Sequence, residues 1–428
     1  MKQMHLLIHR PQINQNKIIS NYTFQDVVYT HEFIFESNIP NDDQIVTIMS
    51  QWMSIIHAVY LFSIEYFDQL TTDFSLSSSE ITFFEKVINN GMAEFRYMNH
   101  IPIEFSTKIY PTEISDIKTT NSKELNGRLL LNGGGKDGLT SGILLDRAGL
   151  DYDLFQIGTG KAQSRTAEAL KKKSIIFIRR MDKRRDKQKY SGHCPTSAAI
   201  AISAVLNAYL LGKSHVISSN ENSANEANLE INGIKINHQY TKSYEFEQDF
   251  SNLLNDKNIQ IKYFSLLRPI HELQIIKIFS KSPKYASNFV SCNHGFRKGF
   301  WCKKCAKCAF INLAFNAISP DFADEIFVTK NSINIVEMHD HILSLINTNI
   351  EKPLECVGTL QECQMAAKMI SENQNITLNN ELKNIMIENS KNINNQDIEK
   401  FIKHIQPDHN VPAEYDSLLA IMQSILND

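Results

Sequence analysis

A glycine-rich loop at the end of an apolar run is the part of this chain best suited to chemistry. Residues 129–138 read Leu-Leu-Leu-Asn-Gly-Gly-Gly-Lys-Asp-Gly. Gly133, Gly134 and Gly135 remove three side chains in a row, so the backbone N–H groups there can approach an anion directly. Lys136 adds a positive charge, and Asp137 can hold Mg²⁺ or order the loop. These residues predict a cradle for phosphate groups.

The residues that follow the loop, 140–150, predict a helix whose N-terminal dipole faces the same anion site. The loop differs from the common nucleoside-triphosphatase loop, which requires G-x-x-x-x-G-K-[ST]. Here Lys136 follows the glycines directly, and the next residue is Asp137 rather than Ser or Thr. The alternative is an ordinary glycine-rich turn, but the Lys-Asp pair at the end of an apolar strand favours the phosphate site.

A cluster of cysteines is the second candidate site. Cys302, Cys305 and Cys308 form a C-x-x-C-x-x-C pattern, and Cys292 lies shortly before it. Four thiolates at this spacing predict a tetrahedral Zn²⁺ site, with a structural role because no coordination position stays open. An iron–sulfur cluster, which also uses four thiolates, is the main competitor.

Further polar residues suit proton transfer or metal binding. Glu221 follows an apolar strand in the sequence Ser-Asn-Glu, where a carboxylate can bind Mg²⁺ or act as an acid or base. His238 lies in a polar stretch, and an imidazole transfers protons near neutral pH. His193 and Cys194 open a long helix, whose N-terminus can lower the pKa of a thiol. A solvated loop, a helix cap or a small buried thiol is the alternative at each place.

Composition limits the classes of partner. The chain has 428 residues, of which 42% are hydrophobic and 21% charged, and its net charge is −3. A basic run over residues 171–189 holds one aromatic residue, Phe177, rather than an interleaved series, and the overall charge is not basic, so nucleic acid is not expected as a partner. The N-terminus lacks the apolar core of a signal peptide, and no uninterrupted apolar stretch has membrane length. Seven cysteines with four clustered favour a metal in a reducing compartment, and therefore a cytoplasmic protein without a membrane partner.

Strand and helix patterns alternate through the middle of the chain and predict an α/β fold with a doubly wound parallel sheet. The expected strands are 129–131, 153–157, 174–178, 215–218 and 261–266. We expect an N-terminal α+β accessory domain over 1–125, a nucleotide-binding α/β domain over 126–290, a metal-binding loop over 291–309 and a helical C-terminal region over 310–428. Ligands of such sheets bind beyond the carboxyl ends of the strands, where the glycine loop lies.

Two helices and two short strands are expected in the N-terminal region. Apolar residues recur at helical spacing over 45–70, and Ser77 to Glu80 caps a second helix over 80–91. Residues 27–29 and 33–35 predict strands.

The motifs together resemble a known family. The loop at 133–138 is similar to the S-G-G-K-D-S pattern of the PP-loop ATP pyrophosphatases, and the whole resembles the UDP-N-acetyl-α-D-muramoyl-L-alanyl-L-glutamate epimerases. The resemblance spans roughly residues 30–360. Its segments are 80–101, the glycine loop, 192–193, 219–221, 237–250, 265–269, 291–308 and 352–359. The loop and cysteines alone also fit the 7-cyano-7-deazaguanine synthases, but 237–250 and 352–359 favour the epimerases.

The resemblance implies a role in peptidoglycan precursor synthesis. Such enzymes convert the terminal L-Glu of UDP-MurNAc-L-Ala-L-Glu to D-Glu, using ATP and Mg²⁺ and releasing AMP and pyrophosphate, and their substrate comes from a Mur ligase that adds L-Glu. It implies that the glycine loop, with Lys136, Asp137 and Thr140, holds ATP and Mg²⁺. It further implies proton and substrate handling by Glu221, His238, His193 and Cys194, and substrate binding by Asn220, Lys242 and Arg268.

One departure from the family pattern concerns the residue after Asp137. The PP-loop ends in Ser, whereas this chain has Gly138, so one hydroxyl for a phosphate is missing. Loss of such a contact costs about 1 kcal/mol, and more when it is charge-assisted. Thr140 or Ser141 can substitute. The alternatives are a PP-loop enzyme that activates another carboxylate, including a peptide-modifying one, and a nucleotide-binding protein without turnover.

Overall fold

Parallel strands form the centre of the molecule, which a computed structural model describes over residues 4–120, 123–186 and 188–428. They lie in the order β13-β10-β7-β8-β9 within one sheet. Their bounds are β7 Arg128–Leu131, β8 Asp153–Ile157, β9 Ser174–Arg180, β10 His215–Ser218 and β13 Lys262–Ser265. The strands expected from the sequence are therefore confirmed, with small differences at their ends.

Helices cover both faces of this parallel half, because neighbouring residues of a strand point to opposite sides. Leu130 packs in one core with α4 (Lys136–Arg147) and α8 (Glu272–Ser280), and Leu129 packs in the other with α6 (Thr196–Leu210). The remaining helices here are α5 (Lys161–Leu170) and α7 (Tyr244–Asp256). A mixed α/β fold with a parallel-rich sheet is thus confirmed.

The order of the strands fixes where a ligand can bind. From β7 the chain passes through α4 to β8 and α5 to β9, and it then returns through α6 to β10 on the other side of β7. The carboxyl ends of β7 and β10 adjoin, and the connections leave them in opposite directions. Such a switch point opens a crevice in α/β sheets. The glycine loop and residues 219–221 both lie there.

The N-terminal strands extend the same sheet through antiparallel pairing of β4 (Val27–Ile34) with β9. The register joins Glu32 to Arg180 and Ile34 to Ile178. Beyond β4 lie β3 (Lys17–Phe24), β2 (Gln12–Asn14), β1 (His5–Ile8), β5 (Gln69–Thr72) and β6 (Lys108–Pro111). A separate short hairpin joins β11 (Leu229–Ile231) to β12 (Ile234–Ile236). The division into domains stays a prediction, although the sheet runs across the expected boundary at 125.

Several expected elements have other bounds in the structure. The two strands expected over 27–29 and 33–35 form one strand, β4, which ends at Ile34. The helix expected over 45–70 is α1 (Gln44–Ala58), followed by a 3₁₀ turn over Val59–Ser63 and then β5, because buried apolar residues continue past the helix end. The helix after the glycine loop begins at Lys136 rather than at 140. The expected cap is confirmed, since Ser77 and Glu80 form a capping box for α2 (Ser78–Gly91).

The apolar segment Gln44–Ser63, which includes α1, is long and apolar enough by composition to cross a membrane. Gln51 and several serines interrupt its apolar residues, so the sequence has no uninterrupted apolar stretch of membrane length here. In the fold, however, 89% of the 18-residue stretch that meets this criterion is buried, as in the core helix of a globular protein. The expected cytoplasmic location stays a prediction.

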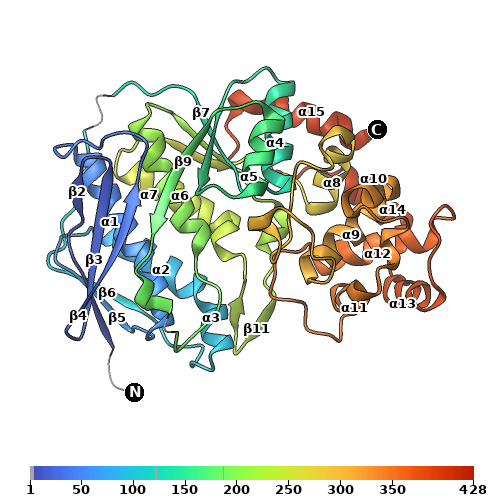
Figure 1. Cartoon of the computed structure of the whole chain (residues 1–428), viewed down its shortest axis with the longest axis horizontal. Helices are drawn as coiled ribbons and strands as arrows, with labels where there is room; N and C mark the ends of the chain where they lie inside the picture. Colours follow the sequence, from blue (N-terminus) through green and yellow to red (C-terminus); the bar gives the residue numbers. More distant parts are fainter. Residues whose placement is uncertain (1–3, 121–122, 187) are drawn as a thin grey trace.

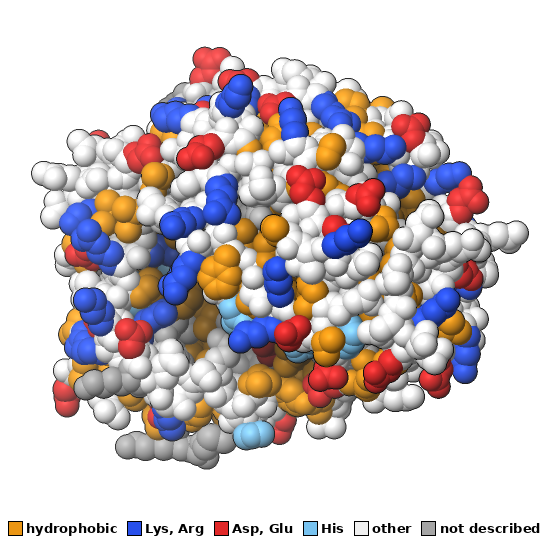
Figure 2. Space-filling view, turned by 45° about the vertical axis from the view of Figure 1, so that its right-hand side comes forward, with side chains coloured by type: hydrophobic (Ala, Val, Ile, Leu, Met, Phe, Trp, Pro, Cys, Tyr) orange, Lys and Arg blue, Asp and Glu red, His pale blue; other side chains and the backbone are white. Residues whose placement is uncertain are grey.

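The C-terminal region is helical, as expected, and lies at the end of the molecule opposite the N-terminal strands (Figure 1). Its helices are α9 (Ala306–Ile318), α10 (Pro320–Phe327), α11 (His339–Ile346), α12 (Leu360–Glu372), α13 (Asn380–Ser390), α14 (Asn395–Lys403) and α15 (Asp416–Asn427). α15 packs back against α8 and α4 and so ties the C-terminus to the sheet. On the face drawn in Figure 2, positive and negative side chains are interspersed rather than gathered by sign.

Candidate active site

The glycine loop is held in one conformation by its surroundings. Gly134 has φ +76°, and a Cβ there would lie 2.7 Å from backbone atoms of Ala162 and Gln163. The Asn132 side chain accepts a hydrogen bond from the Gly134 N–H at 3.0 Å. At Gly133, by contrast, no atom of the described chain lies within 4 Å of where a Cβ would be. The loop is therefore packed on one side and open on the other, as a phosphate cradle requires.

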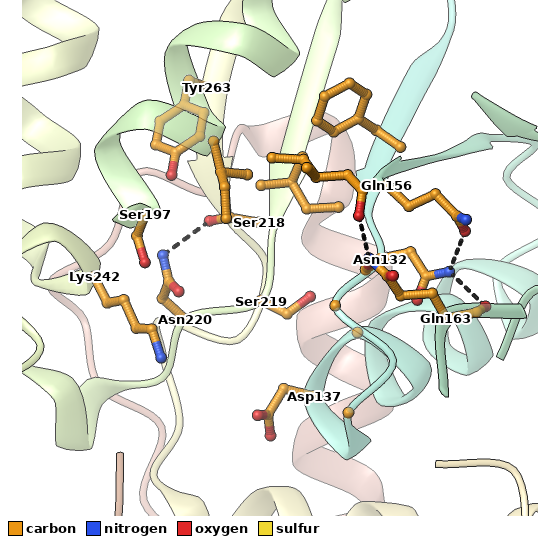
Figure 3. A pocket seen from close by; sticks show the side chains of 17 residues that line it. Asn132, Asp137, Gln156, Gln163, Ser197, Ser218, Ser219, Asn220, Lys242 and Tyr263 are labelled. Carbon is orange, nitrogen blue, oxygen red and sulfur yellow. Dashed lines mark hydrogen bonds between the residues drawn. The ribbon is translucent and has the colours of Figure 1, made fainter. Parts of the chain in front are cut away.

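A cavity of about 270 Å³ opens beside this loop at the switch point of the sheet (Figure 3). Asn132, Gln156 and Gln163 lie on one side of it, and Asn220 and Lys242 lie on the other. Gly133, Gly135, Asp137, Ser218 and Ser219 also line it. The structure thus brings together, around one cavity, the glycine loop, Asp137, Asn220 and Lys242 predicted from the sequence.

Lys136 does not point into open solvent but is fully buried among carboxylates. Its ammonium group contacts the carboxylates of Asp137 and Glu272. Burial lowers the pKa of this amine, but the neighbouring carboxylates Asp137, Glu272 and Glu221 outweigh burial and raise it. Burial is also the main reason why the pKa of Glu272 is raised. Lys136 therefore stays charged and keeps several carboxylates together.

Among the described residues, Asp137, Glu221 and Glu272 offer carboxylate oxygens that all lie within 4.8 Å of one another. Hard oxygen ligands of this kind suit Mg²⁺, which usually keeps waters and substrate phosphates as its other ligands. The donor set therefore fits the expected metal. Asp137 and Glu221 were candidates in the sequence, but Glu272 was missed because it lies at the start of α8, far along the chain.

The hydroxyl missing at Gly138 has a replacement nearby, although not at Thr140. The Thr140 hydroxyl donates to the Lys136 carbonyl within α4 at 2.8 Å. Ser141 instead bonds Ser219 at 2.8 Å, and Ser219 lines the cavity. Ser219 is therefore the hydroxyl best placed for a phosphate, with Ser141 holding it in position.

Arg268 has a different place from the one expected of a substrate ligand. It is fully buried, and its guanidinium group donates to the Glu247 carboxylate and to the backbone carbonyls of Glu221 and Lys242. With its donors engaged in this way, Arg268 holds the two chain segments that carry Glu221 and Lys242. It positions the site rather than meeting a ligand.

His238 and His193 meet at the end of the site formed by Lys242. Their ring centroids are 4.2 Å apart. His238 also bonds the buried Glu94 of α3 (Ala93–Met98), with 2.5 Å between Nδ1 and Oε2, and it bonds the thiol of Cys356. Lys242 Nζ lies 3.0 Å from the same Cys356 sulfur. Glu94 and Cys356 were not candidates in the sequence, since each lies more than a hundred residues from His238 along the chain.

The charges of this cluster, defined as Glu94, His193, His238, Lys242 and Cys356, depend on one another. Burial lowers the pKa of His238, but its bonds to Cys356 and Glu94 outweigh burial and raise it to about 9. Burial raises the pKa of Cys356, but Lys242 and His238 outweigh burial and lower it to about 6. Burial and the neighbouring cations lower the pKa of His193 to about 3. Near pH 7 the cluster holds an imidazolium, a thiolate and a neutral imidazole.

Cys194 does not share these properties. Its thiol lies 3.9 Å from the Val59 carbonyl, and it packs against the apolar core. The expected lowering of its pKa at the helix N-terminus is not found, because burial raises the pKa to about 12. The Cys194 thiol is therefore protonated at neutral pH and unsuited to act as a base.

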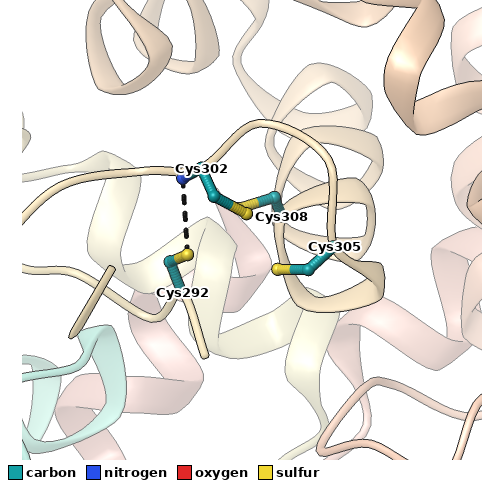
Figure 4. A group of neighbouring side chains, drawn as sticks. All are labelled: Cys292, Cys302, Cys305 and Cys308. Atoms are coloured by element: carbon teal, nitrogen blue, oxygen red, sulfur yellow. Dashed lines mark hydrogen bonds between the residues drawn. The ribbon is translucent and has the colours of Figure 1, made fainter. Parts of the chain in front are cut away.

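The predicted cysteine cluster closes around one point (Figure 4). The sulfurs of Cys292, Cys302, Cys305 and Cys308 all lie within 4.8 Å of one another. The Cys292 sulfur also accepts bonds from the N–H groups of Gly295 at 3.2 Å and Cys302 at 3.4 Å. Four convergent thiols with N–H donors around them fit a structural Zn²⁺.

Comparison with known proteins places these features in a family. The model of the MurL N-terminal domain matches residues 3–266, and that of the MurL C-terminal domain matches residues 288–400. The chain belongs to the MurL family. This confirms the family resemblance found in the sequence.

Similar MurL proteins bear the name UDP-N-acetyl-alpha-D-muramoyl-L-alanyl-L-glutamate epimerase. One from a Micromonospora species is 28% identical over 355 residues, which cover 78% of this chain and 77% of the relative. One from Salinispora tropica is 28% identical, covering 78% and 76%. One from Xanthomonas oryzae pv. oryzae is 27% identical, covering 70% and 68%.

The two MurL matches hold different parts of the candidate site, whereas Glu272 lies between them at the start of α8. The glycine loop, Glu221, His238 and Lys242 fall in the N-terminal match, whereas the cysteine cluster and Cys356 fall in the C-terminal one. Lys242, which lines the cavity, and Cys356, whose sulfur it contacts, thus come from different MurL regions.

Proposed function

We propose that this chain converts the terminal L-Glu of UDP-MurNAc-L-Ala-L-Glu to D-Glu, with ATP as the second substrate and AMP and pyrophosphate as products. The MurL assignment and the names of the relatives support this reaction. The observation that carries the ATP requirement is the glycine loop at the sheet's switch point, next to Lys136 and a group of carboxylates. The strand order and the loop also support a PP-loop type of nucleotide-binding fold.

The chemistry explains why an epimerase uses ATP. An ionised carboxylate makes the adjacent Cα–H hard to remove, since a second negative charge would form next to the first. Transfer of AMP to the carboxylate gives a neutral acyl group, which makes the Cα–H more acidic. Positioned donors then stabilise the enolate. Loss of the proton on one face and its return on the other inverts the centre, and hydrolysis releases AMP.

The residues of the cavity have distinct roles in this proposal. The backbone N–H groups of the glycine loop and the hydroxyl of Ser219 bind phosphate oxygens. Lys136 holds Asp137 and Glu272 in place, and these two carboxylates with Glu221 would hold Mg²⁺. That ion would neutralise charge on the phosphates during AMP transfer. Lys242 lines the cavity, where its ammonium group would stabilise the negative charge that forms on the acyl oxygen when the Cα proton leaves.

The cysteine cluster has a separate, structural role in the proposal. Cys292, Cys302, Cys305 and Cys308 would hold Zn²⁺ with no coordination position left for a substrate. The proposed substrate also requires an enzyme that joins L-Glu to UDP-MurNAc-L-Ala, which is the reaction of a Mur ligase. The chain would act directly after that ligase in the synthesis of cell-wall precursors.

The test is an incubation of the purified protein with UDP-MurNAc-L-Ala-L-Glu, ATP and Mg²⁺, in which pyrophosphate, AMP and the chirality of the hydrolysed glutamate are measured. We expect D-Glu together with AMP and pyrophosphate, and none of the three without the peptide substrate. AMP without D-Glu would show activation of a carboxylate by a different kind of PP-loop enzyme. No product from folded protein would indicate another substrate or a binding function, and would overturn the proposal.

A further inference from the structure

We propose that the thiol of Cys356, paired with His238, is the group that exchanges the Cα proton of the glutamyl residue on one face. This inference rests on the proposed function and names a catalytic residue for it. None of the motifs seen in the sequence singles out Cys356 for this role. It arises from the contacts that the fold creates between distant segments.

The position of Cys356 links the thiol to the cavity. Its sulfur lies 3.0 Å from the amine of Lys242, and Lys242 lines the cavity beside the glycine loop. The Cys356 carbonyl accepts a hydrogen bond from Lys307, whose amine lies 3.9 Å from the Glu272 carboxylate. The thiol is therefore one side chain away from the place where the carboxylate would be activated, and it is held there from two sides.

The charge state of Cys356 suits a base. His238 bonds the thiol, Glu94 bonds His238, and the cations Lys242 and Lys307 face the sulfur from other elements. His193 packs on His238 as a neutral ring. Together these groups favour the thiolate near neutral pH, in a Cys–His pair of the kind that activates thiols in other enzymes. Cys356 is also partly exposed, unlike the buried Cys363.

The other cysteines lack this combination. Four of them form the metal cluster, and Cys194 faces a backbone carbonyl. Cys363 is fully buried in α12, and burial raises the pKa of its thiol. Among all cysteines of the chain, Cys356 alone combines partial exposure, a histidine partner and a cation that lines the cavity.

The proposed proton exchange leaves the enzyme without net change. The Cys356 thiolate forms an S–H bond with the Cα proton, and the electrons of the broken C–H bond move to the acyl oxygen of the activated glutamate. The ammonium group of Lys242 stabilises that negative charge. An acid or a water molecule on the opposite face returns a proton to Cα, and the new thiol loses its proton to solvent. The enzyme is then unchanged, and the glutamyl centre is inverted.

The first test separates activation from proton transfer by measuring pyrophosphate release and D-Glu formation with UDP-MurNAc-L-Ala-L-Glu and ATP. For Cys356→Ala and Cys356→Ser we expect D-Glu formation to fall about hundredfold or more, the size of a general-base effect, with pyrophosphate release within about threefold of wild type. The matched control is Cys363→Ala, which should keep both. D-Glu formation by Cys356→Ala at the wild-type rate would overturn the inference.

The second test needs no turnover. Each protein is treated with iodoacetamide between pH 5 and 9, and alkylation of the peptide that contains Cys356 is followed by mass spectrometry. The wild-type thiol should react near pH 6–7, and His238→Gln should shift this reaction toward the range of a free thiol, near pH 8.5. An unshifted profile would overturn the Cys–His pairing.

The two proposals can fail separately. If wild-type protein releases no pyrophosphate with this substrate, the proposed function is wrong, and the role of Cys356 in it falls too, even where alkylation shows the pair. If wild-type protein makes D-Glu and Cys356→Ala does so equally, only the role of Cys356 is wrong.

Discussion

At Gly134 the chain passes so close to the start of α5 that only a residue without a Cβ fits. The backbone there also has a positive φ, which side chains disfavour. Both constraints hold the loop in one conformation, in which the side at Gly133 stays open. A sequence pattern of three glycines does not reveal this difference among them, because it depends on contacts with Ala162 and Gln163.

Replacement of Gly134 by Ala should therefore damage both fold and function. A Cβ 2.7 Å from backbone atoms must displace the loop or α5, and we expect a loss of about 2–3 kcal/mol in the free energy of unfolding. Denaturant titration measures the loss, and pyrophosphate release should fall with it. Gly149→Ala is the matched control, since Gly149 has φ +68° but an open Cβ position, so its cost should be only about 1 kcal/mol.

Ser219 should supply the phosphate hydroxyl that Gly138 lacks. Loss of one charge-assisted hydrogen bond costs about 1.5 kcal/mol, so Ser219→Ala should lower kcat/KM for ATP about tenfold. The control Ser164→Ala removes a hydroxyl that bonds within α5 outside the cavity, and it should have little effect. Steady-state kinetics at varied ATP concentration measure kcat/KM for both variants, and equal values for Ser219→Ala and wild type would contradict the prediction.

The fold also leaves little room for a side chain at Gly138. A Cβ at this position would lie 3.2 Å from the Leu131 carbonyl oxygen, a tight contact. Gly138→Ser should therefore bring no gain in kcat/KM, because Ser219 already fills the role and the loop must shift to accept the side chain. A clear gain would show that Gly138 is a simple handicap and that Ser219 does not compensate for it.

Among the elements, the cysteine-bearing segment has a second function beyond its own stability. Val290, shortly before Cys292, donates its N–H to the Gly134 carbonyl at 3.0 Å. Ser291 lies beside Gly135, where a Cβ would meet its hydroxyl at 3.2 Å. The segment that carries the cysteine cluster therefore supports the far side of the glycine loop.

Removal of the metal should consequently affect ATP as well as stability. We expect one bound zinc per chain by elemental analysis, and a fall in the thermal midpoint after chelation of about 2–4 °C for each kcal/mol of site stability lost. The KM for ATP should rise at the same time. Cys305→Ser should reproduce both effects, and Cys363→Ala should show neither rise in KM nor loss of zinc. Chelation that leaves the KM for ATP unchanged would contradict the link to the loop.

The parallel strands and the cysteine cluster could be predicted from the sequence because their signals are local. Apolar runs mark the buried strands, and the C-x-x-C spacing keeps the thiols close together in space. Glu272, Glu94 and Cys356 carry no local signal, since only tertiary packing brings them to the site. The expected helix over 45–70 was too long for a related reason, because α1, the following turn and β5 are all buried, and burial hides the change of period.

Over the whole molecule, two buried histidines predict how stability depends on pH. Burial lowers the pKa of His31 to about 3 and that of His57 well below its usual value. Within the described part of the chain, neither ring nitrogen of His31 has a hydrogen-bond partner. Both side chains are therefore neutral when folded but take up protons when unfolded below about pH 6.5. The free energy of unfolding is therefore highest above this pH, and it decreases as the pH falls because the unfolded chain binds protons that the folded chain does not.

The size of the effect follows from proton linkage. Each histidine should lower the free energy of unfolding by about 1.4 kcal/mol per pH unit as the pH falls below about 6.5. Urea titrations from about pH 7 to 4.5 measure the slope of the free energy of unfolding against pH. His31→Leu should reduce that slope by the contribution of one proton, about 1.4 kcal/mol per pH unit. An unchanged slope in that variant would mean that His31 titrates normally in the fold.

The pairing of β4 with β9 has a consequence for how the molecule is made. During synthesis β4 leaves the ribosome about 140 residues before β9, the strand that covers its edge. Until then the nascent hairpin of β3 and β4 presents unpaired N–H and C=O groups, which readily recruit other chains. Conversely, a truncated protein that starts at Lys123 would lack β4, and the edge of β9 that pairs with β4 would have no partner strand. Such a fragment should be prone to aggregate, because an unpaired strand edge recruits other chains.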